Sequence, residues 1–265
     1  MMKKHENGTD LFVQDQGQGA PVILLHGFPL DHRMWEEQVK GLSPHFRVIT
    51  PDFRGMGQSS LPLSAMSLEQ YAQDVLSLMD ELGIEKATLG GFSMGGYVAF
   101  SLLRLAPERF SALILANTRP EPDGPEGRKN RMNMAVSLYD KGAAAARDAM
   151  LPKLVTPATV QDQPQLIDNL KQIMDSMPAE GLVHASIAMA FREDSVPLLS
   201  SITVPTLVIA GEQDAIAPPD VMKSMADRIS NASFQIVPAA SHLVPMEKPE
   251  AFNSLLLEFL HDVKA

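Results

Sequence analysis

Short continuous apolar runs recur along the chain and predict a set of buried strands. The first, PVILLHG at residues 21–27, does not alternate with polar residues, which is typical of a strand covered on both faces. Similar runs follow at RVITPD (47–52), ATLGGF (87–92), ALILANT (112–118), PTLVIAG (205–211) and SFQIVP (233–238). Near the start of the chain, Asn7-Gly8 separates two short runs and predicts a hairpin, because both turn positions favour positive φ.

Helical periodicity occupies the intervals between these runs. In residues 67–83 an apolar stripe at three- and four-residue spacing begins after Ser67, a predicted N-cap, and ends at Gly83. Further helices are expected over residues 94–107 and 249–263. Because strand and helix alternate, we predict an α/β fold with a mostly parallel central sheet flanked by helices.

This alternation lapses between residues 118 and 202. The segment opens with the Pro- and Gly-rich stretch RPEPDGPEG and continues as an Ala- and Met-rich sequence with a helical pattern and no convincing strand. We therefore predict a helical cap at residues 119–202, inserted into a core formed by residues 1–118 and 203–265.

Composition narrows the class of protein. A chain of 265 residues with 45% hydrophobic content is long enough for one large α/β domain with an insertion. The net charge of −10 argues against binding to a phosphate backbone, and the absence of cysteine excludes disulfides and thiolate metal sites. Neither a secretory signal nor an apolar stretch of membrane-spanning length is evident. We expect a soluble cytoplasmic protein with no membrane or nucleic-acid partner.

One glycine-rich stretch carries candidate chemistry. The sequence GFSMG, centred on Ser93, fits the pattern G-x-S-x-G and lies between a predicted strand and a predicted helix. A turn this sharp would hold the serine hydroxyl at the carboxyl end of the sheet, and Gly91 and Gly95 would flank it because Cβ atoms there would collide. An ordinary glycine-rich turn is the alternative; a nucleotide loop is not, because neither G-x-x-x-x-G-K-[ST] nor G-x-G-x-x-G occurs.

A serine nucleophile needs a base and an acid that orients the base. His242 lies in a loop after the last predicted strand, and Asp214 lies in the loop after the preceding strand. Glu212, nearer the strand end, points less readily at that base. An oxyanion hole would use two backbone N–H groups, from Met94 after the nucleophile and from Phe28 in the loop after residues 21–27.

Several of these segments resemble the α/β-hydrolase superfamily. The matching stretches are HGFPLDHRMW, PDFRGMGQSS, GFSMGG, VIAGEQD and SHLVPMEKPE. The chain looks most like small bacterial carboxylesterases, 3-oxoadipate enol-lactonases and cofactor-free perhydrolases. The resemblance implies a triad in the order Ser93, Asp214, His242, an acyl-serine intermediate, and no metal or organic cofactor. Asn117 occupies a strand end that supplies the acid in some relatives, but an asparagine cannot serve as a charged acid.

The expected function is hydrolysis of small to medium, largely apolar carboxylic esters. An enol-lactone or lactone hydrolase and a perhydrolase would use the same triad, and a ligand-sensing protein on this fold is the non-enzymatic alternative. The candidate pocket residues are His26, Arg119, Met132 and Met189. His26 is expected to brace its own loop more than to act as a base. For each methionine, a role as core filler is favoured over a role in the pocket. Arg119 could meet a carboxylate on the substrate.

Overall fold

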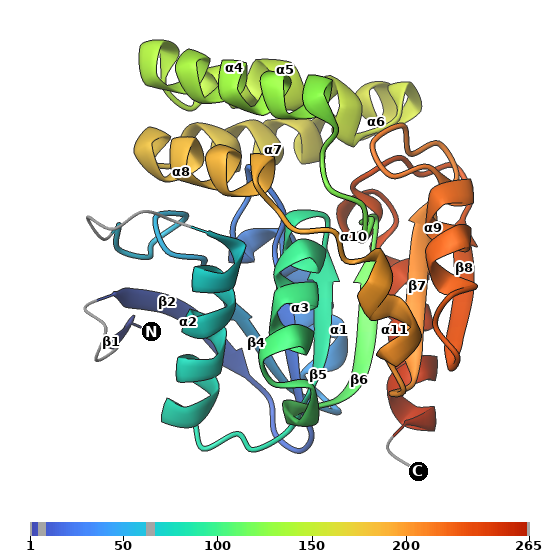
Figure 1. The fold of residues 1–265 in the computed structure, drawn as a ribbon. Helices are drawn as coiled ribbons and strands as arrows, with labels where there is room; N and C mark the ends of the chain where they lie inside the picture. The colour runs from blue at the N-terminus through green and yellow to red at the C-terminus, as the bar shows by residue number, and fades with distance from the viewer. Residues whose placement is uncertain (1, 5–8, 62–66, 264–265) are drawn as a thin grey trace.

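A single sheet organises the chain in this computed structural model, which describes residues 2–4, 9–61 and 67–263 (Figure 1). Across the described residues the sheet has eight strands in the order β1-β2-β4-β3-β5-β6-β7-β8. The strands are β1 (Met2–Lys4), β2 (Asp10–Gln16), β3 (Pro21–Leu25), β4 (Arg47–Pro51), β5 (Ala87–Phe92), β6 (Phe110–Ala116), β7 (Thr206–Gly211) and β8 (Ala232–Val237). Strands β3 to β8 pair in parallel, whereas β2 is antiparallel to both of its neighbours.

All six apolar runs form strands, so the predicted α/β fold class is confirmed. The central strands β5 and β7 are buried at every position because helices cover both faces of the sheet. β8 is an edge strand and is more exposed. The turn of the predicted hairpin at residues 7–8 lies outside the described residues, although β1 and β2 on either side of it pair antiparallel.

Helices pack on the two faces of the sheet. Figure 1 shows α2 and α3 in front of the sheet and α1 behind it, and α11 packs against α1. The predicted N-cap of α2 is confirmed, because the Ser67 hydroxyl accepts a hydrogen bond from the Gln70 N–H. These core helices are α1 (Glu36–Leu42), α2 (Leu68–Glu81), α3 (Met94–Leu105), α9 (Pro219–Ala226), α10 (Val244–Glu247) and α11 (Pro249–Asp262).

Five helices lie between β6 and β7 in the chain and are here called the helical insertion. They are α4 (Pro125–Lys141), α5 (Ala144–Leu154), α6 (Pro157–Asp162), α7 (Pro164–Asp175) and α8 (Ala179–Ala190). In Figure 1 the insertion lies over the carboxyl ends of the parallel strands, with α4 and α5 in an outer layer above α7 and α8. Three short 3-10 helices complete the described elements: η1 (His32–Trp35), η2 (Pro107–Arg109) and η3 (Val196–Ser201).

Trp35, the single tryptophan, links the core to the carboxyl end of the sheet. Its ring stacks on Phe252 of α11 and meets Phe92 of β5 edge-on, with centroids 6.2 and 6.3 Å apart. Phe92 in turn lies 5.0 Å from the imidazole of His242. Trp35 therefore has a packing role, and this aromatic cluster supports one wall of the candidate site.

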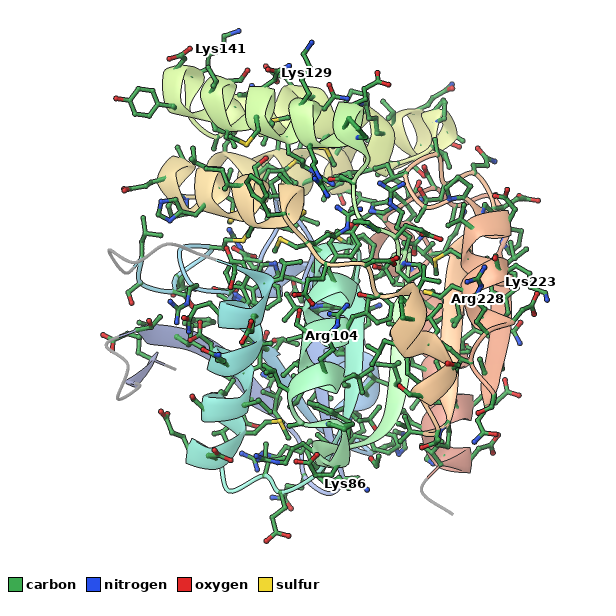
Figure 2. The ribbon with its side chains drawn as sticks, viewed as in Figure 1. Lys86, Arg104, Lys129, Lys141, Lys223 and Arg228 are labelled. Atoms are coloured by element: carbon green, nitrogen blue, oxygen red, sulfur yellow. The ribbon has the colours of Figure 1, made fainter. Side chains whose placement is uncertain are left out.

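Charged groups are spread over the molecule. Figure 2 shows Lys129 and Lys141 on the outer helix α4, Lys86 at the opposite end, and Lys223 with Arg228 beside the β8 edge. These labelled side chains therefore do not form one basic patch. Across the described part of the chain, no helix is both long and apolar enough to cross a membrane.

Candidate active site

Ser93 occupies the sharp turn between β5 and α3. Its φ of 52° and ψ of −113° are strained for a residue with a side chain. The two flanking glycines permit this turn: a Cβ at Gly91 would collide with the Gly95 backbone, and one at Gly95 would collide with the Leu25 carbonyl oxygen. This is the close packing expected from the sequence. The Ser93 side chain is left at the carboxyl end of the sheet and partly exposed.

A chain of hydrogen bonds joins Ser93 to a histidine and an aspartate. The His242 Nε2 atom lies 2.9 Å from the Ser93 hydroxyl, and its Nδ1 atom lies 2.8 Å from Oδ2 of Asp214. The three side chains come from loops after β5, β7 and β8, which are brought together because parallel strands end at one edge of the sheet. The structure thus brings together all three residues predicted from the sequence.

The Asp214 carboxylate is held in one orientation. Its Oδ1 atom accepts backbone N–H groups from Ile216 and Ala217, at 2.7 and 3.0 Å, so Oδ2 faces His242. Burial raises the pKa of Asp214, but His242 and the hydrogen-bond donors outweigh that effect, and the net shift lowers the pKa. The group is therefore ionised at neutral pH and can stabilise a positive charge on the imidazole.

Asn117 is a site residue whose role sequence reasoning missed. Its amide Nδ2 donates to Oδ2 of Asp214 at 2.8 Å, and it has a positive φ of 48°, which asparagine tolerates. From the sequence, this strand-end position is weighed only as a source of the acid, which an asparagine cannot be. Its place directly after a strand, level with the serine turn, was the available signal.

The loop after β3 lies against the serine. An ideal Cβ built on Gly27 would be 3.2 Å from Cβ of Ser93 and would clash with the Phe92 ring, so Gly27 packs closely against the Phe92–Ser93 segment. This proximity supports Phe28 N–H as one oxyanion donor and Met94 N–H, at the start of α3, as the other. Both assignments remain predictions.

His26 braces this loop and has no free ring nitrogen for a substrate. Its Nε2 accepts the Phe53 N–H at 3.0 Å, and its Nδ1 lies 3.1 Å from the Gly27 carbonyl oxygen. Full burial lowers the pKa of His26, which keeps the ring neutral. These contacts correct the expectation that His26 is a pocket residue and support its bracing role.

The two methionines proposed for the pocket differ in position. Met132 lies on the outer helix α4 with 42% of its surface exposed, so it does not support a pocket wall, which corrects that expectation. Met189 is buried in α8, the helix layer next to the sheet, and stays a predicted pocket residue.

Arg119 belongs to a cluster of arginines around one buried carboxylate. Asp123 accepts hydrogen bonds from Arg119 and Arg131, at 2.9 and 3.1 Å, and from Arg192 at 2.9 Å. Burial raises the pKa of Asp123, but Arg192 and Arg131 outweigh it and lower the pKa to about 2. Arg192 also lies over the ring of Tyr97, one helical turn beyond Ser93. Three cations against one anion leave this cluster with excess positive charge.

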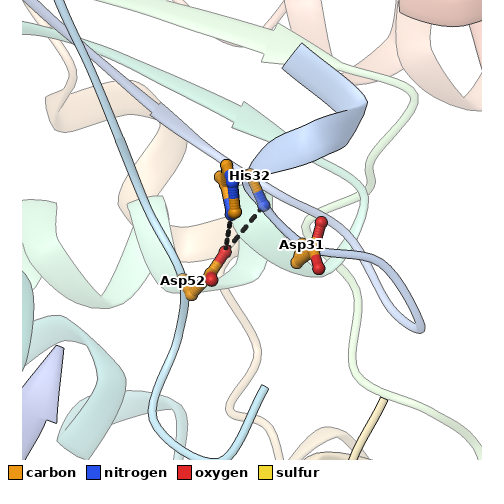
Figure 3. Close-up of side chains that lie close together, drawn as sticks. All are labelled: Asp31, His32 and Asp52. Carbon is orange, nitrogen blue, oxygen red and sulfur yellow. Dashed lines mark hydrogen bonds and ion pairs between the residues drawn. The ribbon is translucent and has the colours of Figure 1, made fainter. Parts of the chain in front are cut away.

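A second buried cluster has the spacing of a metal site among the described residues. It consists of Asp31, His32 and Asp52, whose candidate ligand atoms lie within 4.8 Å of one another (Figure 3). Oδ1 of Asp52 accepts from both the backbone N–H and Nδ1 of His32 at 2.7 Å. Asp31 is bound by the guanidinium of Arg33. Because these bonds tie the β4 loop to η1, we assign the cluster a structural role.

Comparison with known proteins defines the family. The profile of the alpha/beta hydrolase fold matches residues 20–249. A thermophilic esterase from Thermogutta terrifontis, solved with malate bound, superposes with a TM-score of 0.97 at 39% identity, covering 100% of this chain and 99% of the esterase. AB hydrolase superfamily protein YisY of Bacillus subtilis is 34% identical, covering 97% of each chain. 3-oxoadipate enol-lactonase 2 of Acinetobacter baylyi is 32% identical, covering 90% of this chain and 87% of the enol-lactonase.

This chain belongs to the alpha/beta hydrolase fold family. Its sheet order, its serine turn and the match over most of its length agree on that point. Within the family, its similar proteins include both an esterase and an enol-lactonase.

Proposed function

We propose that the protein is a serine hydrolase that cleaves carboxylic esters of small to medium, largely apolar substrates. The observation that supports this proposal is the continuous hydrogen-bonded chain from Ser93 through His242 to Asp214. Similarity to the Thermogutta esterase favours ester substrates. The helical insertion, which lies over the carboxyl ends of the strands, would act as a cap that shapes the pocket.

The proposed reaction proceeds by two acyl transfers. His242 Nε2 takes the proton of Ser93 as the Oγ atom attacks the ester carbonyl, and the Phe28 and Met94 N–H groups stabilise the oxyanion. The imidazolium then gives its proton to the leaving alcohol, and an acyl-serine remains. His242 then takes a proton from a water whose oxygen attacks this ester, and it returns that proton to Ser93 Oγ as the bond to the acyl group breaks and the acid is released. Asp214 keeps the imidazole proton on Nδ1 throughout.

A ladder of p-nitrophenyl esters, from acetate to decanoate, tests this function. We expect the highest kcat/KM among the short acyl chains, because a cap over the serine restricts long ones. Assays with and without hydrogen peroxide distinguish the perhydrolase alternative, in which peroxide replaces water in the second transfer. Faster turnover of decanoate than of butyrate would contradict the predicted pocket, and the absence of turnover on every ester would favour a ligand sensor.

Lactone hydrolysis with an anionic substrate is a second candidate, favoured by the arginine cluster. Arg119, Arg131 and Arg192 share the single carboxylate of Asp123, so the cluster can accept another anion. Two similar proteins agree with this candidate: one is named an enol-lactonase, and the esterase was solved with malate, a dicarboxylate.

The Arg119→Ala variant tests that candidate. The loss of a charge-assisted hydrogen bond should raise KM about tenfold for an anionic substrate. A suitable pair is p-nitrophenyl hemisuccinate and p-nitrophenyl butyrate, which differ mainly in the terminal carboxylate. Only the hemisuccinate KM should rise. The matched control is Arg128→Ala, which removes an exposed arginine of α4 that lies outside the cluster and should leave the hemisuccinate KM unchanged. Equal KM values for hemisuccinate in wild type and Arg119→Ala would reject the role.

A further inference from the structure

Glu247 is a buried acid outside the proposed triad that connects two distant segments. Only 2% of its surface is exposed, and it lies at the end of α10, five residues after His242. Its Oε1 atom accepts hydrogen bonds from the Thr156 backbone N–H and the Thr159 hydroxyl, each at 2.7 Å. Its Oε2 atom accepts the backbone N–H of Ser241, also at 2.7 Å.

The two oxygens of this carboxylate face different parts of the molecule. Thr156 is the N-cap of α6 and Thr159 lies in its first turn, so Oε1 holds the helical insertion. Ser241 immediately precedes His242, so Oε2 holds the backbone from which the imidazole projects. In addition, the backbone N–H of Leu243 donates a hydrogen bond to the Leu154 carbonyl oxygen at 2.8 Å. The histidine loop is therefore fastened to the insertion on both sides of His242.

We propose that Glu247 is a positioning residue that fixes His242 relative to Ser93 by clamping the histidine loop to the helical insertion. The proposal rests on the proposed function, in which His242 acts as the base. His242 makes its 2.9 Å contact to Ser93 from a loop, and loops hold side chains less firmly than helices or strands. Displacement of a catalytic group by about 1 Å can lower a rate about a hundredfold. Glu247 limits such displacement without contacting the substrate.

Three substitutions separate the two sides of the clamp. Glu247→Gln keeps the shape of the side chain, but its amide NH2 is a donor and must face either the Thr156 N–H or the Ser241 N–H, which are donors too. Only one of the two segments therefore stays hydrogen-bonded to residue 247. Glu247→Ala releases both sides. Thr159→Val removes the hydroxyl that reaches Glu247 from the insertion, together with its contact to the Thr156 hydroxyl, and leaves the Thr156 N–H bond to Glu247 in place. The matched control is Glu250→Gln, the same change three residues later at an exposed position.

The experiment measures, for each variant, the fraction of chains with a reactive Ser93 and the rate at which that serine is labelled. A fluorophosphonate titrates the fraction of chains with a reactive Ser93, and its rate constant reports how well His242 activates that serine. Steady-state kcat and KM on p-nitrophenyl butyrate accompany the titration. We expect full titration in all variants, with kcat and the labelling rate lowered about tenfold in Glu247→Gln and up to about a hundredfold in Glu247→Ala. KM should change little, and Glu250→Gln should match wild type.

A double-mutant cycle completes the test. Thr159→Val should lower kcat in the wild-type background and have no further effect in Glu247→Ala, because its partner is then absent. Unchanged kcat in fully titrated Glu247→Gln and Thr159→Val would overturn the proposal. A fall in activity that comes only from fewer reactive serines, with kcat and the labelling rate of each reactive serine unchanged, would overturn it too. Failure of the reagent to label wild type would overturn the proposed serine chemistry itself, and the positioning role with it.

Discussion

Replacement of Ser93 by alanine should lower kcat/KM for the best p-nitrophenyl ester by roughly 10⁴–10⁶-fold. Ser93 supplies the oxygen that is hydrogen-bonded to His242, and alanine leaves the imidazole with no nucleophile to activate. The change also relieves little strain, because alanine at this position keeps the same φ of 52°. Stability should therefore remain close to that of wild type.

The assay compares wild type, Ser93→Ala and Ser254→Ala on the same ester. Ser254 is an exposed serine on α11, so its variant controls for the loss of a hydroxyl elsewhere in the chain. Equal kcat/KM in wild type and Ser93→Ala, with Ser254→Ala also unchanged, would exclude Ser93 as the nucleophile.

Replacement of Asp214 by asparagine should lower kcat by about 10⁴-fold with a much smaller change in KM. The asparagine oxygen must face the Ile216 and Ala217 N–H groups, so its amide NH2 would point at Nδ1 of His242. The imidazole would then accept at Nδ1 and carry its proton on Nε2. In that tautomer it cannot take the proton of Ser93.

Unfolding measurements supply a second readout for Asp214. Because the folded pKa is lowered from 3.8, the carboxylate stabilises the fold above that pH, and the contribution is lost as pH falls through the folded pKa. The stability difference between wild type and Asp214→Asn should thus be largest near neutral pH and shrink below about pH 4. Asp140→Asn, at an exposed position on α4, is the control. A kcat for Asp214→Asn within a few-fold of wild type would contradict the orienting role.

The sequence alone predicts most of the sheet because each strand is marked by a short apolar run of its own. Apolar runs such as residues 87–92 and 205–211 are buried on both faces and need no long-range knowledge to be recognised. The order of the triad residues also follows, since strand ends of a parallel sheet share one edge. The arrangement of α4 to α8 depends on contacts between distant segments. The exposed position of Met132 could therefore not be inferred from the Ala- and Met-rich composition of the helical insertion.

The supporting residues of the site depend on contacts between distant segments. Asn117 donates to Asp214 across 97 residues, and Glu247 binds Thr156 across 91. Neither contact leaves a periodic pattern in the sequence, and a glutamate near a loop is usually a surface residue. His26 illustrates the reverse case: its position near the site suggested a pocket role, but both of its ring nitrogens are occupied by backbone groups.

Covalent labelling tests the central claim most directly. Wild type and His242→Ala would be incubated with a fluorophosphonate, and the modified residue located by mass spectrometry of the proteolysed protein. If Ser93 is a nucleophile activated by His242, wild type acquires one adduct, on the peptide that contains Ser93, and His242→Ala acquires it far more slowly. An unmodified wild type, an adduct on another residue, or equal labelling in both proteins would contradict the account.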